Sequence, residues 1–213
     1  MNRIALVNAS ILAGLALTAA PAAANNQEWV LGLGLGVYSF SEIDDERQDK
    51  PVLGSELDTG ALFQGYVEWY ALEEIGFGYR VIGIGTGRSA VDPATGDKLE
   101  QTVGIGLSLF TINWVPIGAE SDTRLGVILG IGGAGYQNEV SITDAVTGAK
   151  LSASDTSEGS AVLVGVYLDF GGGGFGGRVG MHSIDTDLDD LSDGSRVDGS
   201  GVAFYGDIRW AFD

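Results

Sequence analysis

The side chains best suited to catalysis lie together late in the chain. His182 is the only histidine, Ser183 follows it directly, and Asp185 lies two residues beyond. A histidine base must come within about 2.6–3.2 Å of a serine nucleophile to activate it. Adjacent residues of a β-strand point to opposite faces, so His182 and Ser183 would be separated if this stretch is a strand. The pattern favours a rim histidine that hydrogen-bonds to polar loop groups over a catalytic pair.

Two acidic runs contain the residue types of a calcium site. In residues 185–194, oxygen-bearing side chains alternate and a glycine ends the run, as in calcium loops. The run lacks the closing glutamate of an EF-hand, and residues 41–46 leave the same question open. Both runs are typical of solvated acidic loops. We therefore expect no metal site and no cofactor, with weak divalent-ion binding as the alternative.

The composition excludes several other kinds of chemistry. The chain has no cysteine, which rules out disulfides and thiolate zinc sites. Its net charge of −18 argues against a nucleic-acid partner, which requires a basic surface. Glycine occurs 35 times, but no helix follows the glycine runs, and a phosphate-binding loop needs a helix start.

The last stretch of the chain alternates with a period of two. From Val202 to Phe212, every second residue is apolar except Gly206, and the positions between them include Asp207 and Arg209. This alternation predicts a strand with two different faces. Its length matches the roughly 9–11 residues with which a tilted strand crosses a bilayer. Because the charged face cannot contact lipid, we expect it to line a closed lumen.

Eight strands of this kind can be recognised along the chain. They cover residues 28–40, 58–70, 75–86, 101–114, 123–136, 161–170, 175–184 and 202–212. In residues 101–114 the apolar face is assigned to Val103, Ile105, Leu107 and Leu109. Residues 75–86 alternate least clearly, since Ile82 and Ile84 fall on the polar face. The sequence therefore predicts an all-β fold, an eight-stranded antiparallel up-and-down transmembrane β-barrel.

The charges within the strands indicate which face points inward. All of them fall at the alternate positions that form the polar face of their strand. Four are acidic and four are basic: Glu28, Glu68, Asp169 and Asp207, and Arg80, Arg124, Arg178 and Arg209. A soluble barrel with an apolar interior is the alternative. However, a face of glycine, tyrosine and balanced charges suits a filled lumen better than a solvated surface, because buried charges must be paired. We expect these eight residues to form a lumenal charge network.

Aromatic residues gather at one end of the predicted strands. This set comprises Trp29, Trp69, Phe77, Phe170, Phe175, Trp210 and Phe212. Such rings are typical of the aromatic girdle at a membrane surface. The connections at this end are short, and those at the other end are long, at about residues 41–57, 87–100, 137–160 and 185–199. A hairpin within the third long connection is suggested by Val140, Ile142 and a Thr147-Gly148 turn.

The N-terminus has the features of a targeting segment. Arg3 precedes an apolar stretch, and small residues ending at Ala24 provide a cleavage site. We predict a signal peptide over residues 1–24, with a membrane anchor as the alternative, and the barrel domain over residues 25–213.

This architecture, the lumenal charge pairs and the ending Ile208-Arg209-Trp210-Ala211-Phe212 resemble the small eight-stranded outer-membrane barrels of the OmpA and OmpX type, including OmpW-like and opacity-type proteins. The resemblance covers residues 28–213. It implies a multi-pass barrel in the bacterial outer membrane, with outer-membrane lipid and lipopolysaccharide as partners. It also implies that the assembly machinery binds the C-terminal strand. Asp213 departs from the family pattern, which usually ends on the aromatic residue.

Three functions are compatible with these features. The first is a non-catalytic barrel that presents acidic loops for envelope integrity or surface interaction. The second is a narrow channel for small or apolar solutes, similar to OmpW. The third is an enzyme that acts on lipid A; it depends on His182 alone, because lipid A deacylase barrels use a related histidine–serine pattern.

Overall fold

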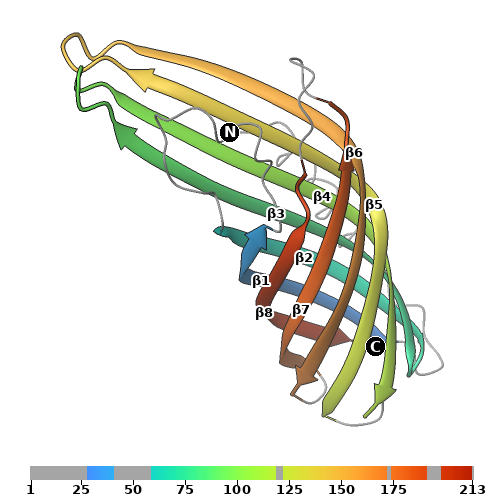
Figure 1. Cartoon of the computed structure of the whole chain (residues 1–213). Coiled ribbons are helices and arrows are strands. Elements are labelled where there is room, and N and C mark those ends of the chain that lie inside the picture. The colour runs from blue at the N-terminus through green and yellow to red at the C-terminus, as the bar shows by residue number, and fades with distance from the viewer. Residues whose placement is uncertain (1–27, 41–58, 119–121, 172–173, 191–197, 213) are drawn as a thin grey trace.

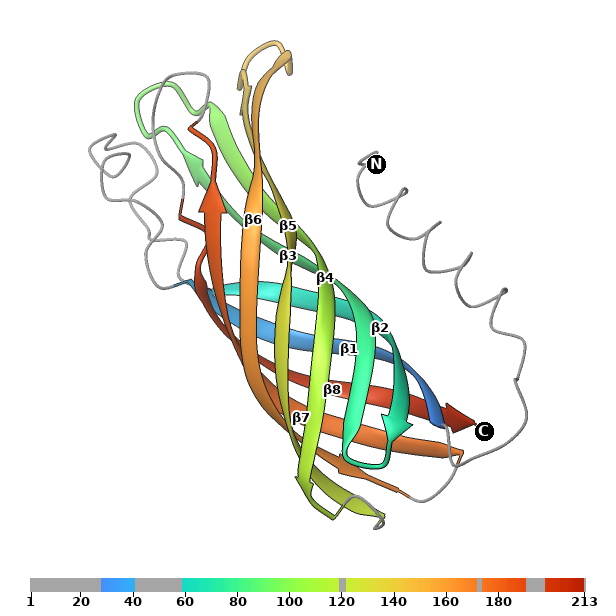
Figure 2. The same cartoon turned by 90° about the vertical axis from the view of Figure 1, so that its right-hand side faces the viewer.

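The computed structural model describes residues 28–40, 59–118, 122–171, 174–190 and 198–212. Its strands are β1 (Glu28–Phe40), β2 (Thr59–Leu72), β3 (Ile75–Val91), β4 (Lys98–Ile117), β5 (Thr123–Thr143), β6 (Lys150–Phe170), β7 (Phe175–Leu188) and β8 (Gly201–Phe212). They form a closed barrel in sequence order (Figures 1 and 2). The predicted eight-stranded antiparallel barrel is therefore confirmed. Within the described residues, no helix is long and apolar enough to cross a membrane.

Pairing of β8 with β1 closes the barrel. The two strands are antiparallel and in register from Trp29 opposite Phe212 to Phe40 opposite Gly201. Each of the eight described strands therefore has a neighbour on both sides, and backbone groups in the ring find partners there. The predicted signal peptide and the acidic run at residues 41–46 lie outside the described residues.

The interior has two layers of different chemistry. Toward the short turns it holds the charged residues described below. Toward the long hairpins it holds an apolar layer, whose residues are Leu62, Ile82, Ile84, Val103, Ile105, Leu107, Leu109, Ile128, Leu163 and Ile184. These side chains are at most 3 % exposed. The lumen is thus filled by aliphatic side chains on one side and by an ionic network on the other.

The faces of β4 are opposite to those predicted. Val103, Ile105, Leu107 and Leu109 were expected to face lipid, but they belong to the buried apolar layer. The outward residues of this strand are instead Phe110, Ile112 and Trp114, all at least 50 % exposed. The physical reason is that the interior becomes an apolar core near the hairpins, so alternate apolar residues there point inward.

Two of the expected long loops are mostly strand. By register, residues 86–91, 98–103, 138–143 and 150–155 form a continuous four-stranded sheet. We call it the hairpin sheet. It extends beyond the other four strands toward the upper left of Figure 1. The predicted hairpin around Thr147-Gly148 is confirmed, since only residues 144–149 separate β5 from β6.

The two turns at the tip of the hairpin sheet are built alike. In the first turn, the Asp92 N–H donates to the Asp97 carbonyl, and the Gly96 N–H donates to the Asp92 carbonyl. In the second, the Asp144 N–H donates to the Ala149 carbonyl, and the Gly148 N–H donates to the Asp144 carbonyl. The glycines have φ values of +80° and +70°, which favour this residue. The turns also touch, because the Ala145 N–H donates to the Asp97 carboxylate at 2.9 Å. The tip is therefore a connected pair of turns.

Acid is expected to loosen this tip. The Asp144 carboxylate accepts hydrogen bonds from Thr147 N–H, Thr147 Oγ1 and Val146 N–H, which lower its pKa. A carboxyl with a lowered pKa in the ordered turn stabilises the turn above its ordinary pKa of about 3.9, and this contribution is lost as the pH falls through the lowered value. The protection factors of the Val146 and Thr147 amides against hydrogen exchange, which are corrected for the intrinsic pH dependence of exchange, should therefore fall as the pH drops below about 4. Asp144→Asn should remove this pH dependence, and its persistence in the variant would contradict the assignment.

Candidate functional site

Glu68 lies at the centre of the polar layer of the lumen. Its carboxylate pairs with Arg178 through Nη1 and Nη2, at 2.7 and 2.9 Å, and with Arg80 Nη2 at 3.1 Å. Arg178 also forms two hydrogen bonds with Asp169, at 2.6 and 3.0 Å. These four side chains are at most 1 % exposed. Two arginines and two carboxylates thus neutralise one another away from water, as buried charges require.

Aromatic and amide groups complete the coordination of this centre. The Arg178 guanidinium lies 3.9 Å from the ring centre of Tyr167, and that of Arg80 lies 4.3 Å from the ring centre of Tyr66. Arg80 Nη1 donates to the Gln64 side chain, whose amide donates in turn to Asp207. Sequence reasoning missed Gln64, because an uncharged amide does not stand out on a polar face.

The other predicted charges lie nearer the short turns. Arg124 Nη1 contacts Glu28 at 2.6 Å, and both side chains are about one-fifth exposed. Arg209 lies 3.8 Å from Glu28 and 3.9 Å from Asp169. The structure therefore brings the eight predicted residues together on the inner wall, linked through direct ion pairs or through Gln64.

Glycines make room for these large side chains. A Cβ at Gly34 would overlap Asp207 Oδ1, and a Cβ at Gly126 would overlap the Tyr167 ring. Two of the lumenal positions thus lack a side chain, and groups from other strands cross the barrel there. The role of these two glycines is steric.

His182 lies in the lumen and not at the rim, contrary to the expectation. Its side chain is fully buried, contacts the Tyr205 ring with ring centres 4.2 Å apart and planes inclined at 40°, and faces Gly165 on β6. Neither ring nitrogen has a hydrogen-bond partner among the described residues. The expected rim position was wrong because β7 continues to Leu188. Ser183 points to the opposite face, as parity predicts, so the two side chains do not meet.

The predicted aromatic residues all occupy the outward face. Trp29 and Trp69 have ring centres 6.3 Å apart, and Phe77 lies 6.4 Å from Trp69. Phe170, Phe175 and Trp210 are 45–70 % exposed, and Phe212 is partly exposed. Trp114 was missed, because the faces of β4 were assigned the wrong way round. Its signal was the alternation of Phe110, Ile112 and Trp114.

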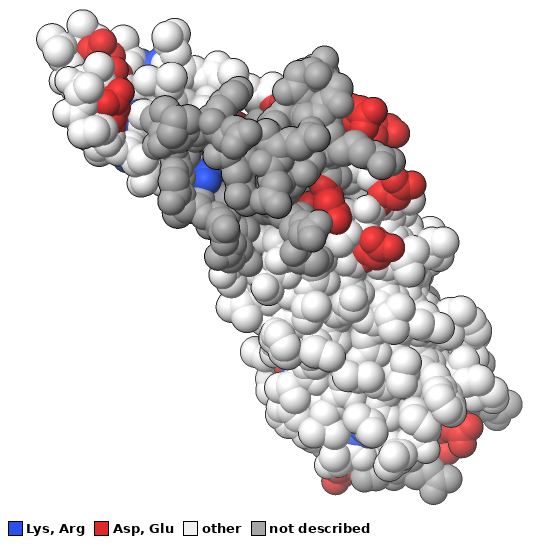
Figure 3. Space-filling model, viewed as in Figure 1, with Lys and Arg blue, Asp and Glu red and all other residues white. Residues whose placement is uncertain are grey.

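A broad band of uncharged surface surrounds the barrel above these rings. Its exposed residues are aliphatic or aromatic and include Leu33, Leu35, Phe63, Leu129, Ile131, Val164, Val179, Phe204 and Ile208. On the face shown in Figure 3, this band separates acidic residues near the short turns from others nearer the hairpins. Apolar surface of this extent is stable against hydrocarbon and unfavourable in water.

The acidic run at residues 185–194 is only partly described. Asp185 and Asp187 lie in β7, and Asp185 accepts a hydrogen bond from Ser200 Oγ. Residues 191–194 are outside the described part. Across the residues that the structure does describe, no group of three carboxylate, histidine or cysteine side chains is arranged to hold a metal ion.

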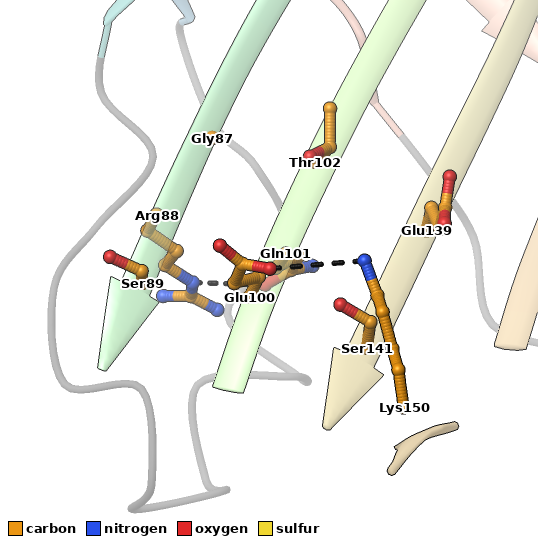
Figure 4. Close-up of a pocket in the computed structure, with 9 residues that line it drawn as sticks. All are labelled: Gly87, Arg88, Ser89, Glu100, Gln101, Thr102, Glu139, Ser141 and Lys150. Carbon is orange, nitrogen blue, oxygen red and sulfur yellow. Dashed lines mark hydrogen bonds and ion pairs between the residues drawn. The ribbon is translucent and has the colours of Figure 1, made fainter. Parts of the chain in front are cut away.

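A polar groove of about 450 Å³ lies on the hairpin sheet. Its lining includes Ser89, Glu100, Thr102, Glu139, Ser141 and Lys150. The register pairs Ser89 with Glu100, Glu100 with Ser141, and Thr102 with Glu139, which places these side chains on one face. This face continues the lipid-facing side of the barrel. In Figure 4, Lys150 extends from β6 toward Glu100, with Glu139 and Ser141 beside it.

The exterior and the ionic interior together define the class of protein. An apolar belt outside, charges paired inside and a closed antiparallel ring are the features of a membrane-spanning β-barrel of the bacterial outer-membrane type. The chain is such an outer-membrane β-barrel.

Solved structures of known proteins have a fold similar to that of this chain. The chain is similar to Ail, the attachment invasion locus protein of Yersinia pestis, in a structure with the heparin analogue sucrose octasulfate. The identity is 14 %, the TM-score is 0.50, and 88 % of this chain and 100 % of Ail are covered. It is also similar to a major outer membrane protein from Thermus thermophilus, with 10 % identity, a TM-score of 0.50 and the same coverage. No family model and no curated protein matches the sequence. At these identities the likeness shows the fold alone.

Proposed function

We propose that this protein is a non-catalytic, non-conducting outer-membrane barrel that holds the hairpin sheet above the membrane for surface interaction. The filled lumen is the observation that carries the proposal. Arg80, Glu68, Asp169 and Arg178 occupy the interior on the short-turn side, and the apolar layer occupies it on the hairpin side. A barrel filled in this way serves as a rigid support.

A narrow channel is the second candidate function. The glycines of the inner wall favour it, but aromatic and charged side chains occupy the space beside them. A solute would also have to pass the apolar layer, and apolar constrictions exclude water and ions by dewetting. We therefore prefer the non-conducting barrel.

Planar-bilayer recordings test this choice. The purified protein is expected to give no steady unitary currents in bilayers in which an open porin, used as the control, conducts. The reason is that neither layer of the lumen leaves a continuous aqueous path. Steady single-channel currents from the purified barrel would contradict the proposal and favour the channel.

Catalysis on lipid A is the third candidate, and the geometry of His182 argues against it. The histidine is enclosed by Gly165 and Tyr205, and Ser183 lies on the outer face. A nucleophile and its base must be in hydrogen-bond reach of each other. Lipid A from cells with and without the protein should accordingly give the same mass spectrum. A new lipid A species that disappears in His182→Ala would contradict a non-catalytic role.

The uncharged band and the last strand, β8, indicate which molecules contact the protein in the cell envelope. We expect outer-membrane lipid to contact the uncharged band, and lipopolysaccharide to surround the barrel on the hairpin side. The alternating outward residues Ile208 and Trp210 at the end of β8 are 61 % and 63 % exposed. They suit recognition by the outer-membrane assembly machinery, as the family resemblance implies. Asp213, the departure from the family pattern, lies outside the described residues.

A further inference from the structure

The hairpin sheet has an open edge along β6. This strand pairs with β5 over its whole length, from Lys150 to Phe170, but it pairs with β7 only from Gly159 onward. In the part of the chain that the structure describes, residues 150–156 thus have no strand beside them on the side away from β5. Such an edge presents N–H and C=O groups with which a further strand can form hydrogen bonds.

The even-numbered residues direct their backbone groups toward this edge. The Glu158 carbonyl accepts a hydrogen bond from the Asp189 N–H, which lies on the side away from β5. Because backbone groups alternate in direction along a strand, Lys150, Ser152 and Ser154 present theirs on the same side. Residues 150–154 are all exposed, so that a further strand has access to them.

This edge is complementary to itself. A two-fold axis perpendicular to the sheet at Ser152 sets two copies of β6 side by side and antiparallel. Lys150 then lies opposite the partner's Ser154, and Leu151 lies opposite the partner's Ala153. About six backbone hydrogen bonds can form in this arrangement. Lys150 is the only charged residue in residues 150–154, and it faces a neutral residue, so no like charges oppose one another.

Leu151 determines the register. It lies beside Ile142 of β5, and the two side chains are 76 % and 44 % exposed. This apolar pair ends at the open edge. An axis at Ser152 covers it with the partner's Ala153. An axis one residue further along would instead set Leu151 opposite the partner's Asp155 and bring a carboxylate against apolar surface, which is unfavourable.

The symmetry of this contact determines where the second copy lies. The hairpin sheet runs on from the wall of the barrel (Figure 1), so an axis perpendicular to the sheet lies roughly in the membrane plane. Rotation by 180° about such an axis reverses the direction of the barrel. Two copies in one membrane point the same way, and their two-fold axis runs along the membrane normal. The second copy therefore belongs to a facing membrane.

We propose that the β6 edge joins two copies of this protein across facing outer membranes, through antiparallel pairing of residues 150–154. This inference rests on the proposed function, because it names the partner of the surface that the barrel supports. One pairing of this length is weak, since two short strands alone are marginally stable. Many copies in each of two facing membranes add their contacts, so membranes associate where single molecules do not.

The test uses the full-length barrel in proteoliposomes, with turbidity as the readout. Vesicles with the native barrel are expected to aggregate, and vesicles without protein are expected to stay dispersed. Ser154→Pro should abolish the aggregation, because proline lacks the N–H that pairs at the edge. Ser154→Ala is the matched control: it keeps the N–H and should aggregate like the native barrel. Both variants should migrate on gels as the compact barrel, since residue 154 is exposed.

A pair of charged variants tests the register and the identity of the partner. Leu151→Asp and Ala153→Lys each set a charge against a neutral residue of the same variant, so each should lose aggregation. When vesicles of the two variants are mixed, aggregation should return. The reason is that the introduced carboxylate of one variant faces the introduced ammonium group of the other. Both side chains are exposed in the single barrel, so neither change should affect folding.

Three results would overturn the inference: dispersed vesicles of the native barrel, undiminished aggregation of Ser154→Pro, or no return of aggregation in the mixture. Conductance of the same barrels separates these results from failure of the proposed function. A silent barrel whose vesicles stay dispersed would refute the second copy as the partner and leave the closed support intact. Steady currents would refute the closed support.

Discussion

Replacing Arg178 by methionine is expected to lower the free energy of unfolding by about 3–5 kcal/mol. Arg178 is fully buried and makes four hydrogen bonds, two to Glu68 and two to Asp169. Methionine fills part of the space but leaves Asp169 without its close partner, since the Arg209 guanidinium is 3.9 Å away. Glu68 keeps Arg80 and the weaker hydrogen bond that the Tyr70 hydroxyl donates at 3.3 Å. The cost is that of a buried carboxylate whose charge is no longer balanced.

The measurement is equilibrium unfolding by urea in detergent micelles, supported by the temperature at which the barrel loses its compact migration on gels. Arg124→Met is the matched control, because Arg124 makes a similar ion pair with Glu28 at 2.6 Å but remains 18 % exposed. Its loss should cost only about 1 kcal/mol, as for pairs in contact with water. Equal effects of the two substitutions would show that burial of the network does not determine its strength.

The ionic network illustrates what the sequence can reveal. All charges within the strands share one parity, and a bilayer forbids them on the outer face, so their inward direction follows from alternation alone. The ion-pair partner of each charge cannot be predicted from the alternation. Glu68 and Arg178 are 110 residues apart, and only the curvature of the closed ring places them face to face. For the same reason Gln64, which connects Arg80 to Asp207, was not predictable.

On the hairpin side, the prediction that apolar residues face outward is wrong. This prediction assumes lipid along the whole strand, and it breaks down where the strands leave the membrane. There the interior becomes an apolar core like that of a soluble protein, and the outer face becomes polar or glycine-rich. Ile82 and Ile84, which disturbed the alternation of β3, were the visible sign of this change.

The predicted strand lengths were too short for a related reason. Strands were limited to a length suited to crossing a bilayer, whereas β5 and β6 have 21 residues each. The alternation that continues through Val140 and Ile142 marked the extension, but only the hairpin was inferred from it. The groove of the hairpin sheet was therefore missed, since most of its lining residues, Gln101 and Thr102 apart, were assigned to loops.

Leu109→Ala is the second substitution with a large expected effect, about 2–5 kcal/mol of lost stability. Leu109 is fully buried in the apolar layer, where it lies on the same strand as Leu107 and faces the lumen. Truncation removes apolar contacts and leaves a cavity that the closed ring can only partly collapse.

The neighbouring residue provides the decisive control for the orientation of β4. Phe110 is 71 % exposed on the outer face, where lipid chains can fill the space left by Phe110→Ala, so that substitution should cost about 1 kcal/mol or less, well below the loss for a core aromatic. Urea unfolding of both variants in the same micelles compares the two faces directly. If Phe110→Ala were the more damaging change, Val103, Ile105, Leu107 and Leu109 would face lipid after all. The apolar layer would then be absent, and the lumen would be open on the hairpin side.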